Sequence, residues 1–171
     1  APLSLDGIWT TGADSVAGFR VGESFLLQSG TIVGRTDAVT GSLVISNNVI
    51  TSGTFQVDLS KVTITINQQT NNLAKVLDTV TYPGATFTLT EPITVAQLPA
   101  NGQTLSSNAT GSLTMNNITR SVTLTLTGRY DGEALEATGS APVLVSDWGI
   151  ESPIGIHNDA EIEFLTVLHR E

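Results

Sequence analysis

The stretch GSLTMNNITRSVTLTLT, residues 111–127, alternates apolar with small or hydroxyl-bearing side chains on both sides of an Asn-Asn pair. Alternation with a period of two is typical of half-buried β-strands, and threonine suits their exposed face. Asparagine tolerates positive φ angles, so Asn116-Asn117 can form a two-residue hairpin turn. The stretch therefore predicts two antiparallel strands that bury one face.

The same pattern recurs elsewhere along the chain. Residues 61–66 alternate cleanly, and a last strand is predicted through Glu161 towards Leu168. Asp131-Gly132 and Asn47-Asn48 are further hairpin signals. Since strands and turns follow one another without a break in composition, we predict a single all-β domain over residues 1–171.

One segment departs from the alternation. Leu73, Val76 and Leu77 stand at helical spacing after a polar start, and Pro83-Gly84 follows. These residues predict one short helix in an otherwise antiparallel barrel.

The predicted turns on either side of residues 118–130 imply a pairing register. The implied pairs are Tyr130–Glu133, Leu126–Ala137, Leu124–Gly139 and Val122–Ala141 on one side, and Met115–Ile118, Gly111–Val122 and Ala109–Leu124 on the other. Bulky apolar residues are then flanked by glycine and alanine, which leaves space for a ligand inside a small barrel. The alternatives are that another sheet or the helix fills this trough, or that a bulge at Pro142 changes the register beyond it.

The same register places Arg120 on the apolar face, between Leu113 and Val143. An inward guanidinium is costly unless it is paired. Its partner would be a protein carboxylate, with Asp147 the nearest candidate in sequence, or an anionic ligand headgroup. Because Arg120 lies near a strand end, its charged head could also reach water.

Composition and charge exclude several functions. The formal net charge is −9, with Lys61 and Lys75 as the only lysines, which argues against nucleic acid as a partner and against docking on anionic lipid surfaces. There are no cysteines, so no thiol nucleophile, disulfide framework or Cys-type zinc site exists. No apolar run is long enough to span a membrane as a helix, so we expect no direct membrane insertion by this chain.

No catalytic or metal-binding motif emerges, and we predict no enzyme and no cofactor. There is no Gly-x-Ser-x-Gly elbow and no phosphate-binding glycine loop. His157, Asp159, Glu161 and Glu163 fall on one face of an extended chain, which fits the solvated face of the last strand better than a metal site. Trp9 is expected in the core, whereas Trp148 suits either the core or a pocket wall.

Four segments in order resemble the YceI-like family. Residues 111–122 resemble its Gly-x-Leu-Thr and Val-Thr-Arg-Pro-Val signature, and residues 15–21 resemble its early Ser-x-x-x-Phe-x-Val strand. Residues 73–83 are similar to its helix and following Tyr-Pro step, and residues 146–150 to its Asp-Phe-Gly-Ile turn. The resemblance spans nearly the whole chain, although the family's His-Gly before Val-Thr-Arg is here Asn117-Ile118.

The resemblance implies a lipocalin-like antiparallel β-barrel with a long apolar interior that binds isoprenoid chains or similar amphiphiles. It also implies an extracytoplasmic protein, secreted, periplasmic or held at the cell envelope, and the Ala1-Pro2-Leu3 start fits a mature export product. We expect an amphiphilic lipid as the partner, bound for transport or storage. The expected ligand-binding residues are Phe19, Val21, Leu113, Met115, Arg120, Val122, Leu124, Leu126, Trp148 and Phe164.

An alternative from another class remains open. The chain could be a secreted barrel with a solid core that binds a protein or glycan through its loops, residues 98–107 being the candidate contact loop. Uptake of a hydrophobic dye in stoichiometric amount would distinguish the hollow barrel from the solid one.

Overall fold

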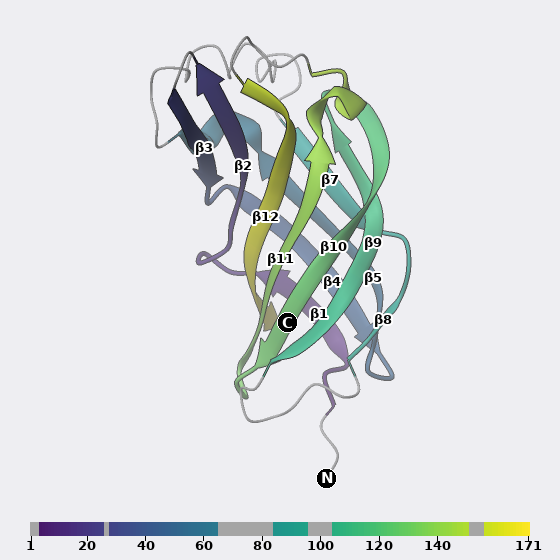
Figure 1. The fold of residues 1–171 in the computed structure, drawn as a ribbon. Helices are drawn as coiled ribbons and strands as arrows, with labels where there is room; N and C mark the ends of the chain where they lie inside the picture. Colours follow the sequence, from purple (N-terminus) through teal and green to yellow (C-terminus); the bar gives the residue numbers. More distant parts are fainter. Residues whose placement is uncertain (1–3, 26–27, 65–83, 96–103, 151–155) are drawn as a thin grey trace.

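The computed structural model describes residues 4–25, 28–64, 84–95, 104–150 and 156–171, in which every strand belongs to one antiparallel sheet (Figure 1). The elements are β1 (Gly7–Thr11), β2 (Val16–Phe25), β3 (Gln28–Thr36), β4 (Val39–Ser46), β5 (Val49–Asp58), the 3₁₀ turn η1 (Leu59–Lys61), β6 (Thr63–Ile64), β7 (Gly84–Leu89), β8 (Ile93–Thr94), β9 (Leu105–Met115), β10 (Ile118–Tyr130), β11 (Ala134–Leu144), the 3₁₀ turn η2 (Val145–Trp148) and β12 (Ile156–Arg170). The predicted all-β antiparallel barrel is confirmed. The helix predicted at residues 73–77 lies outside the described residues.

The sheet closes on itself. Its strands follow one another in the order β1-β4-β5-β7-β9-β10-β11-β12, and β12 pairs again with β1. Closure runs from the pair Trp9–Arg170 to the pair Thr11–Leu168. These eight described strands therefore leave no free edge along the closed path, which is how a barrel avoids edge-to-edge aggregation.

Two stretches of the wall are interrupted, so that each forms two strands: β1 is followed by β2, and β3 by β4. β12 pairs with β1 through its last residues and with β2 through residues 156–165. Similarly, β1 pairs with β4, and β2 pairs with β3. The breaks at residues 12–15 and 37–38 let the wall change direction, so β2 and β3 continue it at the end opposite β1 in Figure 1.

The hairpin before β10 has the predicted register. Asn116 and Asn117 have φ angles of 53° and 61°, and the strands pair as Met115–Ile118, Gly111–Val122 and Ala109–Leu124. Positive φ at both central residues is the geometry of the two-residue turn that fits the twist of a hairpin. Asn47 and Asn48 form the same kind of turn between β4 and β5, with φ angles of 53° and 58°.

The predicted register of the hairpin after β10 is wrong by two residues. Tyr130 pairs with Leu135 instead of Glu133, and Leu126 therefore faces Gly139 instead of Ala137. The loop is longer because the Asp131 carboxylate accepts hydrogen bonds from the main-chain N–H groups of Glu133 and Ala134, both at 2.9 Å.

The pairing of β10 with β11 also ends sooner than predicted. It stops at Thr125–Ser140, so the predicted pair Val122–Ala141 does not form. Beyond that point the chain continues into η2, which packs against β10 and β12. Pro142 causes no bulge with the next strand, because the register of β11 with β12 runs unbroken through Pro142–Glu161.

Candidate functional site

The barrel encloses an apolar cavity of about 270 Å³. The side chains that line it come from strands all around the wall, and among them are Val21, Phe55, Leu89, Leu113 and Ile162. Besides the threonines Thr36 and Thr166, the only described polar side chains in the lining are His157 and Glu163. The interior therefore offers dispersion contacts and almost no hydrogen bonds to whatever enters it.

Seven of the ten residues predicted to bind a ligand line this cavity. They are Phe19, Val21, Leu113, Met115, Leu124, Leu126 and Phe164. Val122 and Trp148 are buried beside it, in a cluster with Ala85, Val143 and Ile150. The structure thus brings the apolar members of the set together on one inner surface, while their contact with a ligand stays a prediction.

Arg120 does not enter the cavity. Its side chain is exposed, although its backbone keeps the predicted register opposite Leu113. Its Nε donates to the main-chain carbonyl of Asp147 at 2.9 Å, not to the Asp147 carboxylate. The guanidinium therefore does not point into the barrel; of the alternatives, the structure agrees with a charged head that reaches over the strand end, where it is exposed and contacts η2.

Trp148 occupies the core. It is 2% exposed, and its indole Nε1 donates to the carbonyl of Leu113 at 3.0 Å. Asn116 of the hairpin turn donates through Nδ2 to the Trp148 carbonyl at 2.9 Å. Gly149 then ends η2 with a φ angle of 69°, in the left-handed region that glycine adopts readily. These contacts fix η2 against β9 and make Trp148 part of the wall's support.

Phenylalanine rings lying against glycines shape the cavity. Each phenylalanine whose side chain is described is half-buried, lines the cavity and lies over a glycine of a neighbouring strand. The pairs are Phe19 on Gly34, Phe55 on Gly41, Phe87 on Gly111 and Phe164 on Gly139. A Cβ added at Gly139 would lie 2.5 Å from Cε1 of Phe164, so the ring would have to shift to admit any side chain there. The glycines therefore let the rings lie flat along the wall.

These ring contacts explain why small residues pair with large ones across the strands. The sequence suggested that glycine leaves space, whereas at Gly111 and Gly139 an aromatic ring fills that space. The cavity remains because a ring that lies along the wall does not cross the barrel axis. Sequence reasoning missed Phe55 and Phe87, since their glycine partners depend on the pairing of β4 with β5 and of β7 with β9.

One end of the barrel is filled. Six buried residues, which we call the plug, pack together there: Leu5, Trp9, Leu43, Ile45, Leu135 and Leu168. Trp9 is fully buried, and its indole Nε1 donates to the Leu5 carbonyl at 2.7 Å. Tyr130 meets the Trp9 ring edge-on at 6.1 Å, and the Arg170 guanidinium lies 4.7 Å from its centroid. The plug thus forms a dense floor beneath the cavity.

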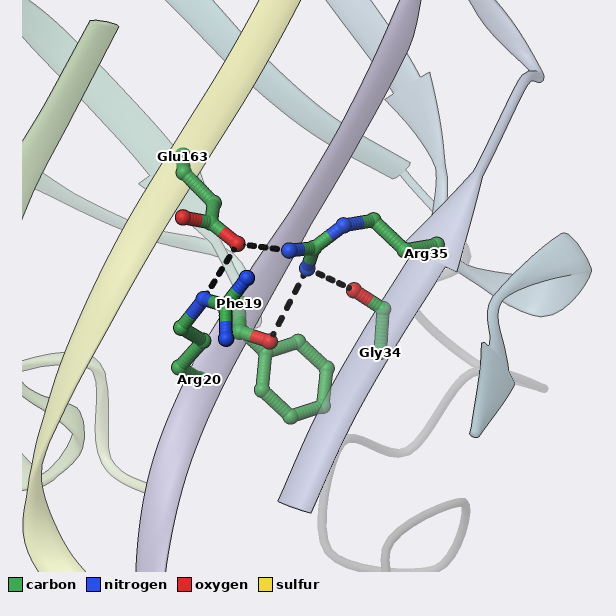
Figure 2. Close-up of polar contacts among 5 residues, drawn as sticks. All are labelled: Phe19, Arg20, Gly34, Arg35 and Glu163. Carbon is green, nitrogen blue, oxygen red and sulfur yellow. Dashed lines mark hydrogen bonds and ion pairs between the residues drawn. The ribbon is translucent and has the colours of Figure 1, made fainter. Parts of the chain in front are cut away.

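An ion-pair network centred on Glu163 joins three strands of the wall (Figure 2). Glu163 of β12 accepts from Arg20 Nε of β2 at 2.9 Å and from Arg35 Nη2 of β3. Arg35 Nη1 also donates to the carbonyls of Gly34 and Phe19, at 2.8 and 3.3 Å. These arginines are 52% and 32% exposed, so water screens the pairs, and their main effect is to hold β12, β2 and β3 in register.

The described residues include few side-chain arrangements that could hold a metal ion or take part in a reaction. No three His, Cys, Asp or Glu side chains among them gather at a distance suited to a metal ion. The His157 ring shares a hydrogen bond of 3.0 Å with Ser24, and Glu163 is held by arginines.

In the part of the chain that the structure describes, no helix has the length and apolar character that crossing a membrane requires.

Several solved structures share this fold. A polyisoprenoid binding domain from Saccharophagus degradans, implicated in plant cell wall breakdown, superposes with a TM-score of 0.73 at 15% identity, over 96% of this chain and 99% of that one. BcnA of Burkholderia cenocepacia has a TM-score of 0.69 at 19% identity, over 91% of this chain and 96% of that one. The Campylobacter jejuni YCEI protein has a TM-score of 0.66 at 16% identity, over 87% and 90%.

At such low sequence identities, similarity to these structures establishes the fold alone. No curated protein matches the sequence. A family model is decisive, because it matches residues 10–168 and so covers nearly the whole chain. The segments that resembled the family lie inside this range, and the chain belongs to the family of YceI-like domains.

Proposed function

We propose that this protein binds a long apolar lipid, with an isoprenoid, quinone or fatty chain, inside the barrel and transports or stores it outside the cytoplasm. The observation that carries the proposal is the cavity of about 270 Å³, whose described lining is almost wholly apolar. Water gains few hydrogen bonds in such a space, whereas a hydrocarbon chain contacts it on every side. The polyisoprenoid binding domain with the same fold supports this choice of ligand.

The energetics favour a chain over a compact polar ligand. Each methylene transferred from water to an apolar site contributes about 0.8 kcal/mol, so a chain of several units binds without many polar contacts. Part of that gain offsets the loss of freedom on association. The aromatic rings of Phe19, Phe87 and Phe164 supply flat surfaces for such a chain.

A binding role without chemical conversion fits the titratable groups in the lining. Of the described lining residues, His157 and Glu163 are the two that carry an imidazole or a carboxyl group. Glu163 is paired with Arg20 and Arg35, whereas His157 and the Ser24 hydroxyl to which it is hydrogen-bonded are both exposed to solvent rather than enclosed with the ligand. The content of Thr, Ser and Asn and the scarcity of lysine support an exported protein.

Native mass spectrometry of the protein purified gently from its own host tests the proposal. We expect a stoichiometric adduct that extracts into organic solvent as a prenyl or acyl lipid. A mass that stays that of the free protein, even after incubation with prenyl lipids, would contradict the proposal and favour a partner bound by the loops.

Leu124→Trp tests the place of binding. Leu124 is 5% exposed and lines the cavity, so an indole at this position should fill the interior and abolish lipid uptake while the barrel still folds. Thr123→Trp is the matched control, since residue 123 is exposed on the outer face of the same strand. Equal uptake by both folded variants, measured by fluorescence of a hydrophobic dye, would refute the position of the site.

A further inference from the structure

Three polar side chains are buried among the described residues, and two of them have clear partners. Ser15, fully buried, accepts from the Val167 N–H at 3.0 Å and lies 3.4 Å from the Val167 carbonyl. Thr36, 4% exposed, accepts from the Ala38 N–H at 3.0 Å. Both hydroxyls replace main-chain partners where the long strands break. Their burial thus has a structural explanation.

Thr166 has no such explanation. It is 4% exposed, and its Oγ1 makes no hydrogen bond. A buried hydroxyl without a partner costs about 1–3 kcal/mol, which valine, almost the same shape, would avoid. Of the three buried hydroxyls, that of Thr166 is therefore the one without a structural role among the described residues.

The position of Thr166 relates it to the ligand cavity. The residue lines the cavity and pairs across the sheet with Ala137, a small neighbour that leaves room beside it. Leu168, two residues further along β12 and on the same face, belongs to the plug. The unpartnered hydroxyl therefore lies just above the floor of the cavity, at the filled end of the barrel.

The charges around the cavity decide what kind of group would suit this hydroxyl. The described lining holds neither lysine nor arginine, and Glu163 is its one side chain with a formal charge at neutral pH. A carboxylate or phosphate at the floor would therefore have no cation to compensate its loss of hydration. A hydroxyl can donate to a carbonyl or ether oxygen and can accept from another hydroxyl.

We propose that Thr166 forms a polar subsite at the floor of the cavity, and that the ligand places an uncharged oxygen function there, a hydroxyl, carbonyl or ether. This inference rests on the proposed function and makes it more specific. It assigns an orientation, with the oxygen-bearing part of the molecule directed inward to the plug and the hydrocarbon part along the phenylalanine rings. It also disfavours lipids whose inner end is anionic.

A set of twelve-carbon probes tests the subsite. Dodecane, 1-dodecanol and dodecanoate compete with a bound hydrophobic dye, and dissociation constants are measured for the wild type, Thr166→Val, Thr166→Ser and Thr166→Ala. The informative quantity is the ratio of the dodecanol to the dodecane dissociation constant, because it cancels effects on the cavity as a whole. Thr125→Val is the matched control, the same change on the exposed outer face of β10.

We expect Thr166→Val and Thr166→Ala to raise this ratio about fivefold, the factor that one typical hydrogen bond contributes. Thr166→Ser and Thr125→Val should leave it close to the wild-type value. Thermal unfolding of the ligand-free proteins should place Thr166→Val at or above the wild type, since the unsatisfied hydroxyl is gone. Dodecanoate should bind the wild type more weakly than dodecanol.

Other outcomes separate the two proposals. A ratio that is the same in all variants, with dodecane and dodecanol both bound, overturns the subsite and leaves the apolar cavity as the ligand site. Tighter binding of dodecanoate than of dodecanol overturns the uncharged oxygen. Failure of the wild type to bind any probe overturns the proposed function, and the subsite falls with it.

Discussion

The plug and the cavity lie inside the same antiparallel sheet, yet one region is filled and the other hollow. At the plug, the bicyclic ring of Trp9 meets branched side chains such as Leu43 and Leu168, and the Trp9 ring is fully buried. Around the cavity, phenylalanine rings face glycines across the strands and stay half-buried. The difference shows that ring placement decides whether a small barrel is hollow.

The physical reason lies in what stands opposite each ring. A ring opposite a bulky side chain must extend into the interior, where it meets rings and side chains from the far wall. A ring opposite glycine can lie down on the neighbouring strand, and its other face stays open. Removing a ring from the plug and adding a methyl group beneath a ring of the cavity should therefore have different consequences.

Trp9→Ala should have the largest effect, and that effect should be on stability. Truncation of a fully buried tryptophan, which also loses its hydrogen bond to the Leu5 carbonyl, costs about 3–5 kcal/mol. Chemical unfolding followed by circular dichroism measures the loss. Ile8→Ala is the control, because Ile8 is 46% exposed and its truncation should change the unfolding free energy by less than about 0.5 kcal/mol. Similar losses in both variants would mean that the plug is not a packed core.

Gly139→Ala should have an intermediate effect, on both stability and ligand binding. The new Cβ would lie 2.5 Å from Phe164 Cε1 and 2.8 Å from Leu126 Cδ2, so the ring must tilt into the cavity. We expect a loss of about 1–3 kcal/mol in stability and of about tenfold in dye affinity. Gly128→Ala is the matched control, because a Cβ added there would have the Glu136 carbonyl oxygen as its nearest neighbour, at an ordinary contact distance of 3.8 Å. Unchanged dye affinity in Gly139→Ala would contradict the role of the glycines.

The two hairpins of β10 show how far the sequence could predict this fold. Asn116-Asn117 predicted the register correctly, because two asparagines with positive φ close the turn without help from other residues. At the other end, the Asp131 carboxylate binds two main-chain N–H groups and lengthens the loop by two residues. A register shift of two residues keeps every side chain on its predicted face of the sheet. The residues predicted to face the interior were therefore right, although their predicted cross-strand partners on β11 were wrong.

The candidate site was predictable in its residue types and not in its arrangement. Alternation alone places Leu113, Leu124 and Phe164 on the inner face. The contact of Phe164 with Gly139, in contrast, needs the register of β11 with β12, which no single turn sets. For Arg120 the sequence named the right neighbour, Asp147, and the right register, but not the partner atom, which is the main-chain carbonyl instead of the carboxylate.

Asp131→Asn should have the smallest effect and concerns the loop that carries Tyr130 and Leu135 to the plug. Hydrogen bonds from the main-chain N–H groups of Ala134 and Glu133 lower the pKa of the Asp131 carboxyl below its ordinary value. A carboxyl with a lowered pKa in the folded state stabilises the fold above its unfolded pKa of about 3.9, and that contribution is lost as the pH falls through the folded pKa. Asparagine keeps an accepting oxygen but does not titrate in this range.

The thermal midpoint of Asp131→Asn should therefore lie slightly below that of the wild type at pH 7, and this difference should shrink as the pH approaches 3. Asp58, whose pKa is also lowered, by the hydrogen bonds from Ser60, contributes to acid sensitivity in both proteins and cancels in the comparison. A difference that stays constant between pH 7 and pH 3 would mean that the Asp131 charge does not stabilise the loop. Dye uptake should be the same in both proteins at pH 7, because the loop supports the plug and not the lining of the cavity.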